Sequence, residues 1–359
     1  MKSYLQNNRT MLIVAALLVL AMLFGLVTPD HGNLVEGVLF GLSTTAFAVN
    51  PELTAVAVAY QNPASALIAD EVLPRVPTAK KFKYTKYTVE QGYTVPETKV
   101  GRKSEPNMVD FGGTDVTDEC IDFGLDDLVP VDEIEAYNAM AKPATGGPVS
   151  PEALSVMMLT GLVQLDREIR AANLVFGAAN YSASNQSTLS GTSQWSDQTN
   201  SNPLNAILQA LDVPLVRPNT MVIGQQAWTM LRQHPKIIQA IGKSAQLGGN
   251  ASLVEVAGLL ELDKILVGRG FYNTARKGQA PTYARAWGKH CSLLHIDSLA
   301  AQLGQPTFGW TAQFGSRIAG AIPEPKAGLR GGQRIRMGES VKEIIVSQDA
   351  GYFFQNCVV

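Results

Sequence analysis

The stretch PEALSVMMLTGLVQLDREIRAANLVF, residues 151–176, decides the architecture of this chain. Its apolar residues recur every three or four positions, which predicts one face of a long helix; this stripe consists of Leu154, Met158, Leu162, Leu165, Ile169, Ala172 and Phe176. Ser150 is placed to cap the helix, Pro151 fits the first helical position, and Gly177 follows the last apolar residue. The charged residues outside the stripe are expected in solvent: Asp166, Arg167, Glu168 and Arg170. The pattern predicts a surface helix that covers a broad apolar surface.

The composition is that of a globular chain. With 359 residues it is long enough for two or three hydrophobic cores, and 17% of its residues are charged. The net charge of −2 lacks the basic excess of a dedicated nucleic-acid-binding protein. The three cysteines, Cys120, Cys291 and Cys357, are far apart and odd in number. They indicate free thiols in a reducing compartment and no disulfide framework.

The amino-terminal segment carries the strongest local signal. Residues 11–27 are all apolar or Gly, and this run is at the short limit for a membrane-spanning helix. Ala46-Phe47-Ala48 forms an A-x-A pattern, which makes the bond between Ala48 and Val49 a candidate processing site. The pattern lies farther from the apolar run than in an ordinary secretory signal. A signal peptide, a membrane anchor and a removable assembly segment therefore remain open for residues 1–48.

A strap and a basic region precede the long helix. Residues 50–79 are small and apolar with four prolines, which favours an extended strap that lies on a neighbour. Residues 80–103 are rich in Lys, Thr and aromatic residues, which predicts two strands of a long exposed hairpin. Its basic residues are Lys80, Lys81, Lys83, Lys86, Lys99, Arg102 and Lys103. With the interleaved aromatic residues they could bind single-stranded nucleic acid, but lysines that protect a solvated strand edge are commoner.

The sign of the charge reverses between residues 115 and 135. This stretch has no Lys or Arg, and its acidic residues are Asp115, Asp118, Glu119, Asp122, Asp126, Asp127, Asp132, Glu133 and Glu135. We expect the basic and acidic stretches to be complementary surfaces that pair within one chain or between copies. Exposed ion pairs contribute only about 0.2–1 kcal/mol each, but repeated around a closed assembly they fix register. The stretch lacks the residue spacing of a calcium loop, so we predict no metal site.

Beyond the long helix the chain consists of short elements. Residues 181–201 are polar and predict a loop at a subdomain boundary. Helices are predicted at residues 203–211, 225–232 and 235–241, and Ser252 with Glu255 forms a capping box ahead of another. Strands are predicted at residues 221–223, 265–267, 292–296, 308–317, 333–336, 342–346 and 352–358. The predicted fold class is mixed α+β.

No motif predicts an enzyme. Asp122-Phe123-Gly124 matches the magnesium motif of kinases, but the glycine-rich and catalytic loops of kinases are missing. His290, Cys291 and His295 lie close in sequence, yet in a strand His290 points away from the other two. We expect them to be structural, and a hydrolase built on Cys291 and His295 is the last alternative. The sequence thus predicts no enzymatic activity, no cofactor and no bound metal.

Three stretches together resemble the major capsid proteins of tailed double-stranded DNA phages, whose Hong Kong 97-like fold is shared with encapsulins. The first runs from residue 217 to 224 and continues to Trp228 and His234-Pro235. The second extends from Trp287-Gly288-Lys289 to Gly309-Trp310-Thr311, and the third is residues 336–354. The resemblance covers roughly residues 49–359 and depends on the order and texture of the segments.

This resemblance implies a subunit with an amino-terminal arm, an extended β-hairpin loop, a long spine helix, and peripheral and axial domains. The implied division is an apolar leader in the place of the segment that some family members remove on maturation (1–48), the arm (49–79), the extended loop (80–130), the peripheral domain with the spine helix (131–202), a mainly axial part (203–328), and strands returning to the peripheral domain (329–359). Scaffolding segments in this family are typically charged and helical, whereas this leader is apolar. Cleavage at Ala48 is therefore left open.

The function implied is that of a structural protein in the virion. Such a subunit self-assembles in the bacterial cytoplasm as hexamers and pentamers of an icosahedral head that encloses double-stranded DNA. The implied partners are further copies, a portal, a scaffold or maturation protease, a decoration protein and, non-specifically, the packaged DNA; no small-molecule substrate is implied. The charged residues of 80–127 would be subunit contacts. The alternatives are an encapsulin-type shell that stores cargo, which the long leader disfavours, and an exported or membrane-anchored binding protein.

Overall fold

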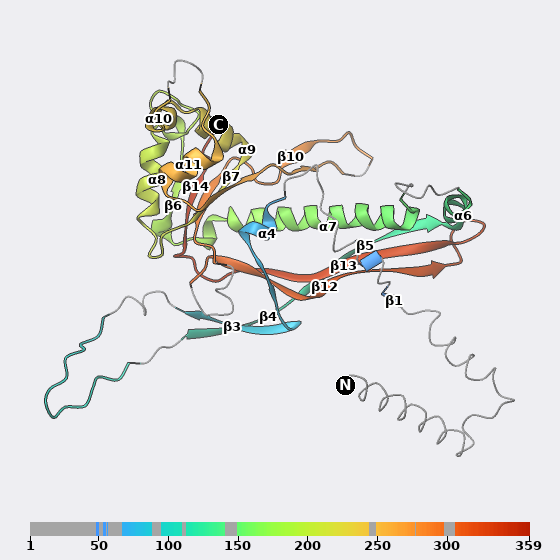
Figure 1. Ribbon diagram of the computed structural model, residues 1–359, viewed down its shortest axis with the longest axis horizontal. Helices are drawn as coiled ribbons and strands as arrows, with labels where there is room; N and C mark the ends of the chain where they lie inside the picture. Colours follow the sequence, from blue (N-terminus) through green and yellow to red (C-terminus); the bar gives the residue numbers. More distant parts are fainter. Residues whose placement is uncertain are drawn as a thin grey trace, which may run out of the picture.

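The computed structural model describes residues 48–49, 53–54, 56, 67–87, 95–109, 113–140, 149–243, 249–276, 278–297 and 306–359. The expected leader lies outside these residues apart from Ala48, and so do residues 50–52, 55 and 57–66 of the strap. A long helix lies on a long sheet, a second sheet with several short helices lies at one end of that helix, and a separate hairpin projects from the body (Figure 1). None of the helices in this part of the chain has the length and hydropathy to cross a bilayer.

The long helix, α7, spans Pro151–Val175. The side chain of Ser150 accepts a hydrogen bond from the backbone N–H of Ala153 at 3.2 Å, and Pro151 occupies the first turn. The backbone N–H of Phe176 closes the last turn on the carbonyl oxygen of Ala172 at 2.8 Å. The predicted start and end of this helix are therefore confirmed.

The predicted buried face of α7 is wrong over the first half of the helix. Leu154, Met158 and Leu162 are 51%, 65% and 55% exposed. The fully buried positions in the first five turns are instead Ser155, Val156, Leu159, Thr160, Val163, Arg167 and Glu168. Residues 153–163 are apolar on almost every side, so two different faces satisfy the helical period. The sheet selects one of them, and it also buries two charges that the period places in solvent.

The long sheet has the strand order β1-β12-β13-β5, with β2 parallel to β12. Its strands are β1 (Ala48–Val49), β2 (Arg75–Pro77), β5 (Ile121–Pro130), β12 (Gly309–Glu324) and β13 (Gly332–Ile345). Helix α7 covers one face, and its Val156, Leu159 and Val163 share a core with Ile335 and Met337 of β13. The strands predicted at 333–336 and 342–346 are parts of the single strand β13. A short helix, α6 (Val131–Ala139), follows β5.

The second sheet has the order β6-β14-β11-β7-β8. Its strands are β6 (Gln186–Thr188), β7 (Thr220–Gly224), β8 (Lys264–Gly268), β11 (Cys291–Leu294) and β14 (Gly351–Gln355). Around it lie α8 (Pro203–Leu211), α9 (Gln225–Gln233), α10 (Pro235–Ala240), α11 (Leu253–Leu260) and the 3-10 turns Ala178–Asn180, Ala183–Asn185 and Gly191–Ser193. The capping box of Ser252 and Glu255 is confirmed at the start of α11. All five residues of β7, which lies between β11 and β8, are buried.

Two strands lie in different sheets from those that the expected division of the chain implies. Strand β5 falls within the expected loop of residues 80–130, yet it pairs with β13 along its whole length. Strand β14 falls within the expected return of residues 329–359, yet it lies between β6 and β11 of the second sheet. It does so because Phe353 and Phe354 are both buried there, on opposite faces of the strand. The domain boundaries themselves stay predictions.

Candidate assembly interface

The basic stretch pairs with the acidic stretch of the same chain. Strand β3 (Lys81–Tyr87) is antiparallel to β4 (Gly113–Glu119), with Lys81 opposite Glu119. The prediction that residues 92–103 supply the second strand is therefore wrong. Pro96 and Gly101 weaken that segment as a strand, whereas residues 113–119 bring carboxylates to the lysines. The two strands form a hairpin that leaves the body of the molecule (Figure 1), and we call residues 80–119 the long hairpin.

Ion pairs join the two strands of the long hairpin and join its base to the sheet. The Nζ of Lys83 lies 2.5 Å from Oδ2 of Asp115, and the Nζ of Lys81 lies 3.7 Å from Oε2 of Glu119. At the base, Lys80 donates to Asp122 at 2.7 Å, and this hydrogen bond is the main reason that the pKa of Asp122 lies below its usual value. The remaining acidic candidates are also paired within the chain: Asp118 with Lys342, Asp126 with Arg336, and Asp127 with Ser155.

The aromatic side chains of β3 attach the long hairpin to the long sheet. The rings of Phe82 and Tyr84 lie 5.8 and 6.1 Å from that of Trp310, and Phe82 is only 8% exposed. Their cluster includes Ile344 of β13. The preceding residue, Glu343, points to the other face of the sheet and pairs with Arg170 of α7. The long hairpin therefore packs on the face of the sheet opposite α7. Because these rings are occupied, the structure gives no support to stacking of single-stranded bases on them.

The far part of the long hairpin, residues 95–109, is exposed throughout. Val95 and Met108 are 85% and 99% exposed. Three further candidates, Lys99, Arg102 and Lys103, lie here and form no ion pair within the described ranges. The side chain of the last candidate, Lys86, is not described. Exposed apolar groups beside unpaired cations give this tip the mixed character of a surface that a partner covers.

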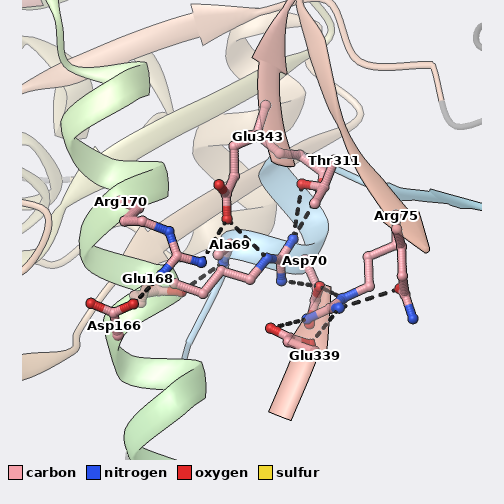
Figure 2. Close-up of polar contacts among 12 residues, drawn as sticks. Ala69, Asp70, Arg75, Asp166, Glu168, Arg170, Thr311, Glu339 and Glu343 are labelled. Atoms are coloured by element: carbon pink, nitrogen blue, oxygen red, sulfur yellow. Dashed lines mark hydrogen bonds and ion pairs between the residues drawn. The ribbon is translucent and has the colours of Figure 1, made fainter. Parts of the chain in front are cut away.

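A second cluster, which the sequence analysis missed, holds the end of the arm. We call it the arm junction; it consists of Asp70, Arg75, Arg167, Glu168, Trp287, Thr311, Glu339 and Glu343. Figure 2 labels six of these residues, Asp70, Arg75, Glu168, Thr311, Glu339 and Glu343. It lies where α4 (Ala69–Val72) and β2 meet α7, β12 and β13. Its charged members come from four elements, α4, β2, α7 and β13, which lie in three regions of the chain that are far apart in sequence. The only local signal for it was the adjacent pair Arg167 and Glu168 in a largely apolar helix.

Glu168 supplies the cap that α4 lacks. Its two carboxylate oxygens accept hydrogen bonds from the backbone N–H groups of Ile68 and Ala69, both at 2.8 Å, and Oε1 also accepts from Nε1 of Trp287 at 2.5 Å. Ile68, at the N-cap of α4, has no side chain that can satisfy these donors. Burial raises the pKa of Glu168, and the three hydrogen bonds oppose that rise. A side chain of the long helix thus fixes the direction in which the arm arrives.

Arg167 connects the arm to the long sheet. Its guanidinium donates to Asp70 of α4, to the carbonyl oxygen of Leu73 at 3.3 Å and to Oγ1 of Thr311 at 3.0 Å, while its Nε lies 3.7 Å from Glu343 (Figure 2). The side chain is only 2% exposed. Burial and the nearby Arg75 lower the pKa of Arg167, and the carboxylates of Asp70 and Glu339 oppose this change.

Arg75 and Glu339 complete the arm junction. Arg75 donates to Asp70 at 2.5 Å and to Glu339 at 2.8 Å, and Arg317 donates to Glu339 at 3.1 Å. Burial favours the neutral form of Glu339, but the neighbouring arginines outweigh it and hold its pKa below the usual value. The pKa of Asp70 is lowered in the same way, against burial, by Arg167 and Arg75. Charges of opposite sign thus hold the arm against the sheet.

The histidine and cysteine residues form no shared site. His290 Nδ1 accepts from the backbone N–H of Asn356 at 3.0 Å, whereas His295 Nδ1 lies 3.0 Å from the carbonyl oxygen of Arg217. Cys291 is completely buried, and burial raises the pKa of its thiol well above the usual value. All three cysteines are free and buried. In the part of the chain that the structure describes, no group of His, Cys, Asp or Glu residues has the arrangement of a metal site.

Comparison with known proteins identifies the family. No family model matches the chain. It is 48% identical over 318 residues to the major capsid protein of Pseudomonas phage JBD67, and the match covers 88% of this chain and 99% of that protein. The chain belongs to the phage major capsid proteins. The capsid role expected from the resemblance is confirmed, and the encapsulin and exported-protein alternatives are not favoured.

Solved structures agree with this assignment at the level of the fold. The capsid subunit resembles a phage-related protein from Bordetella bronchiseptica RB50 with a TM-score of 0.65 and 20% identity, over 87% of this chain and 98% of that one. It also resembles the capsid of cyanophage P-SCSP1u with a TM-score of 0.51 and 11% identity, over 81% of this chain and 88% of that one. Homologous capsid proteins imply that this subunit builds a shell by self-assembly and belongs to the virion.

Proposed function

We propose that the capsid subunit has the Hong Kong 97-like fold and assembles as hexamers and pentamers into an icosahedral head that encloses double-stranded DNA. Helix α7 corresponds to the spine helix, the long hairpin to the extended loop, and the second sheet with its helices to the core of the axial domain. The role is structural and not enzymatic. Assembly takes place in the bacterial cytoplasm, with a portal, a scaffold or maturation protease and a decoration protein as further partners.

The observation that carries this proposal is the amount of apolar surface on the projecting parts of the subunit. Val95 and Met108 lie on the tip of the long hairpin, and Leu154, Met158 and Leu162 form an exposed row on α7. Burial of such surface contributes about 25 cal/mol for each square ångström removed from water. An isolated subunit gains nothing from these side chains. Identical copies that cover one another gain from each of them, repeatedly around the shell.

Within this proposal the charged residues of the long hairpin have two different tasks. Lys80, Lys81 and Lys83 shape the hairpin, because they pair with carboxylates of their own chain. Lys99 and Arg102 contact an adjacent copy together with Lys103, because they have no ion pair in the described part of their own chain. Contacts made by the cations of the tip contribute mainly to the choice of the correct neighbour and register, and less to the affinity between subunits.

The bond between Ala48 and Val49 remains our candidate for processing. In the structure these two residues form β1, with Ala48 opposite Ala321 and Val49 opposite Gly320 of β12. Their extended backbone is the form that a protease cleft binds. Since the same backbone groups are paired with β12, we propose that cleavage precedes the docking of β1. Mass spectrometry of the amino terminus in mature particles tests this, because a start at residue 49 is expected.

The decisive experiment reverses the charges of the tip alone. The full chain with K99E, R102E and K103E is expected to stay folded, with an unchanged melting temperature, but to yield no closed shells in electron micrographs. The matched control, K99R with R102K and K103R, keeps the charge and is expected to assemble. Normal shells from the charge-reversed chain would contradict a role of the tip in subunit contact.

A further inference from the structure

A second, smaller hairpin carries cations that the capsid assembly described above does not use. It consists of β9 (Phe271–Asn273) and β10 (Tyr283–Arg285), with Phe271 opposite Arg285. It projects from the second sheet and, in the view of Figure 1, lies on the other side of α7 from the long sheet. Residues 264–296 contain six Lys or Arg and no Asp or Glu, in a chain whose net charge is −2. The positive charge is therefore local.

The cations of this small hairpin and its flanks have no carboxylate partners in the part of the chain that the structure describes. Arg269, Arg276 and Lys289 are exposed and Arg285 is half-buried, and none of them forms an ion pair within the described ranges. Surface arginines elsewhere do form such pairs, at the following N–O distances: Arg217 with Glu261 at 2.9 Å, Arg330 with Asp132 at 3.2 Å and Arg336 with Asp126 at 2.7 Å. Surface arginines at those places therefore have carboxylate partners, whereas these four cations have none in the described part of the chain.

Arg285 is held in an orientation that suits an external anion. Its guanidinium lies 4.2 Å from the centroid of the Phe271 ring, which is itself 50% exposed. This contact fixes the plane of the guanidinium and leaves the N–H groups at its edge available. A planar fork of donors matches two oxygens of a phosphate. Tyr283, which is 67% exposed and is followed two residues later by Arg285 on the same face of β10, extends this surface.

A second copy of the subunit is a poor source of the missing negative charge. The acidic stretch is the obvious candidate, but Asp115, Glu119, Asp122 and Asp126 are already paired with cations of their own chain. Asp132 and Glu135 are likewise paired, with Arg330. The exposed Glu97, Glu105 and Glu133 form no ion pair in the described ranges, but they offer three separate charges and not a regular array. A polyanion with its own regular array of charges fits the small hairpin better. Duplex DNA presents one phosphate charge about every 1.7 Å of helix axis.

We propose that the small hairpin contacts the phosphate backbone of double-stranded DNA through Arg269, Arg276, Arg285 and Lys289. The inference extends the proposed function, because a head that encloses DNA brings this partner to the subunit. Contact through phosphates alone is independent of base sequence, as packaging of a whole genome requires. Each phosphate neutralised by a cation adds about 0.9 to the magnitude of the slope of log affinity against log salt concentration.

The test compares two full-length variants that lose the same charge. R269Q with R276Q and R285Q removes three cations of the small hairpin and its flank, and the control R217Q with R330Q and R336Q removes three arginines that are paired within the chain. Binding to a fluorescein-labelled duplex is measured by anisotropy from about 50 to about 200 mM sodium chloride. The hairpin variant is expected to bind roughly tenfold more weakly at low salt, with a slope reduced by about two to three. The control is expected to match the unsubstituted chain.

Equal affinity and slope in both variants would overturn the inference. Electron microscopy of the same samples separates it from the proposed function. Shells from the hairpin variant with weakened duplex binding support it, whereas lost shells with unchanged duplex binding would make the small hairpin a subunit contact and overturn it. If the unsubstituted chain forms no shells, the proposed function fails, and the anisotropy comparison still decides whether the small hairpin binds DNA.

Discussion

The arm junction and the long hairpin are both held by ion pairs of Lys or Arg with Asp or Glu, but these ion pairs differ in their exposure to solvent. In the arm junction the side chains of Arg167 and Glu339 are 2% and 0% exposed. In the long hairpin those of Lys83 and Asp115 are 62% and 49% exposed. A buried charge that loses its partner keeps the full cost of leaving water, whereas an exposed charge is solvated again. The same chemistry therefore fixes the arm and leaves the long hairpin adjustable.

The largest effect is expected for Arg167→Met, which keeps the volume of the side chain and removes its charge. The variant loses the hydrogen bonds that Arg167 donates to Asp70, Leu73 and Thr311, whereas Asp70 keeps Arg75 and Glu343 keeps Arg170 as a partner. We therefore expect the free energy of unfolding to fall by about 3–4 kcal/mol in urea denaturation. Arg170→Met on the same helix is the control, because Arg170 is 23% exposed and a smaller loss is expected. Equal losses in the two variants would remove the distinction between buried and peripheral pairs.

A smaller loss is expected for Glu168→Gln. An amide offers one acceptor oxygen, so one of the backbone donors at Ile68 and Ala69 would face an NH2 group. We expect a loss of about 1–3 kcal/mol and faster hydrogen exchange at α4. Trp287→Phe removes one donor to Glu168 together with part of a completely buried ring. It is expected to lower the overall stability, but to leave the protection of α4 relative to the rest of the chain close to that of the unsubstituted chain. Unchanged exchange in Glu168→Gln would show that the carboxylate does not hold the arm.

Acidification should loosen the arm junction. The pKa values of Asp70 and Glu339 lie below their ordinary values of 3.8 and 4.5, so their stabilising effect is present above those values and is lost as the pH falls through the lowered ones. The raised pKa of Glu168 has the opposite sign: its contribution to stability is larger when it is protonated and falls as the pH rises. Because two carboxylates oppose one, the protection of amides near Asp70 against hydrogen exchange, corrected for the intrinsic rate at each pH, should fall below about pH 4. Constant protection factors down to about pH 2 would contradict this.

The smallest effect on the isolated subunit is expected in the long hairpin. Exchange of the charges at Lys83 and Asp115, as K83D with D115K, should restore what either substitution alone removes. A double-mutant cycle should give a coupling of about 0.2–1 kcal/mol that shrinks as salt is added. A coupling as large as that at Arg167 would show that the long hairpin is held as rigidly as the arm junction.

Local patterns predicted the elements of this fold well. The cap at Ser150, the proline at 151 and the 3.6-residue period were enough to define α7, and the capping box at Ser252 defined the start of α11. These signals succeed because they involve neighbours within one helical turn. The partner of β3 was predicted wrongly. A basic and an acidic segment of one chain can pair in several registers, and the residues between them do not select one register.

The sequence by itself determined the long helix, the mixed α+β class, the opposite charges of the two stretches and, through the order of its segments, the resemblance to phage capsid proteins. Only the tertiary structure decided which face of α7 is buried, that Arg167 and Glu168 lie inside, and that β5 joins the long sheet. The reason is distance along the chain. A helix that is apolar on several sides can pack on any of them, and a buried charge is tolerated only where partners such as Asp70 and Glu343 arrive from remote segments.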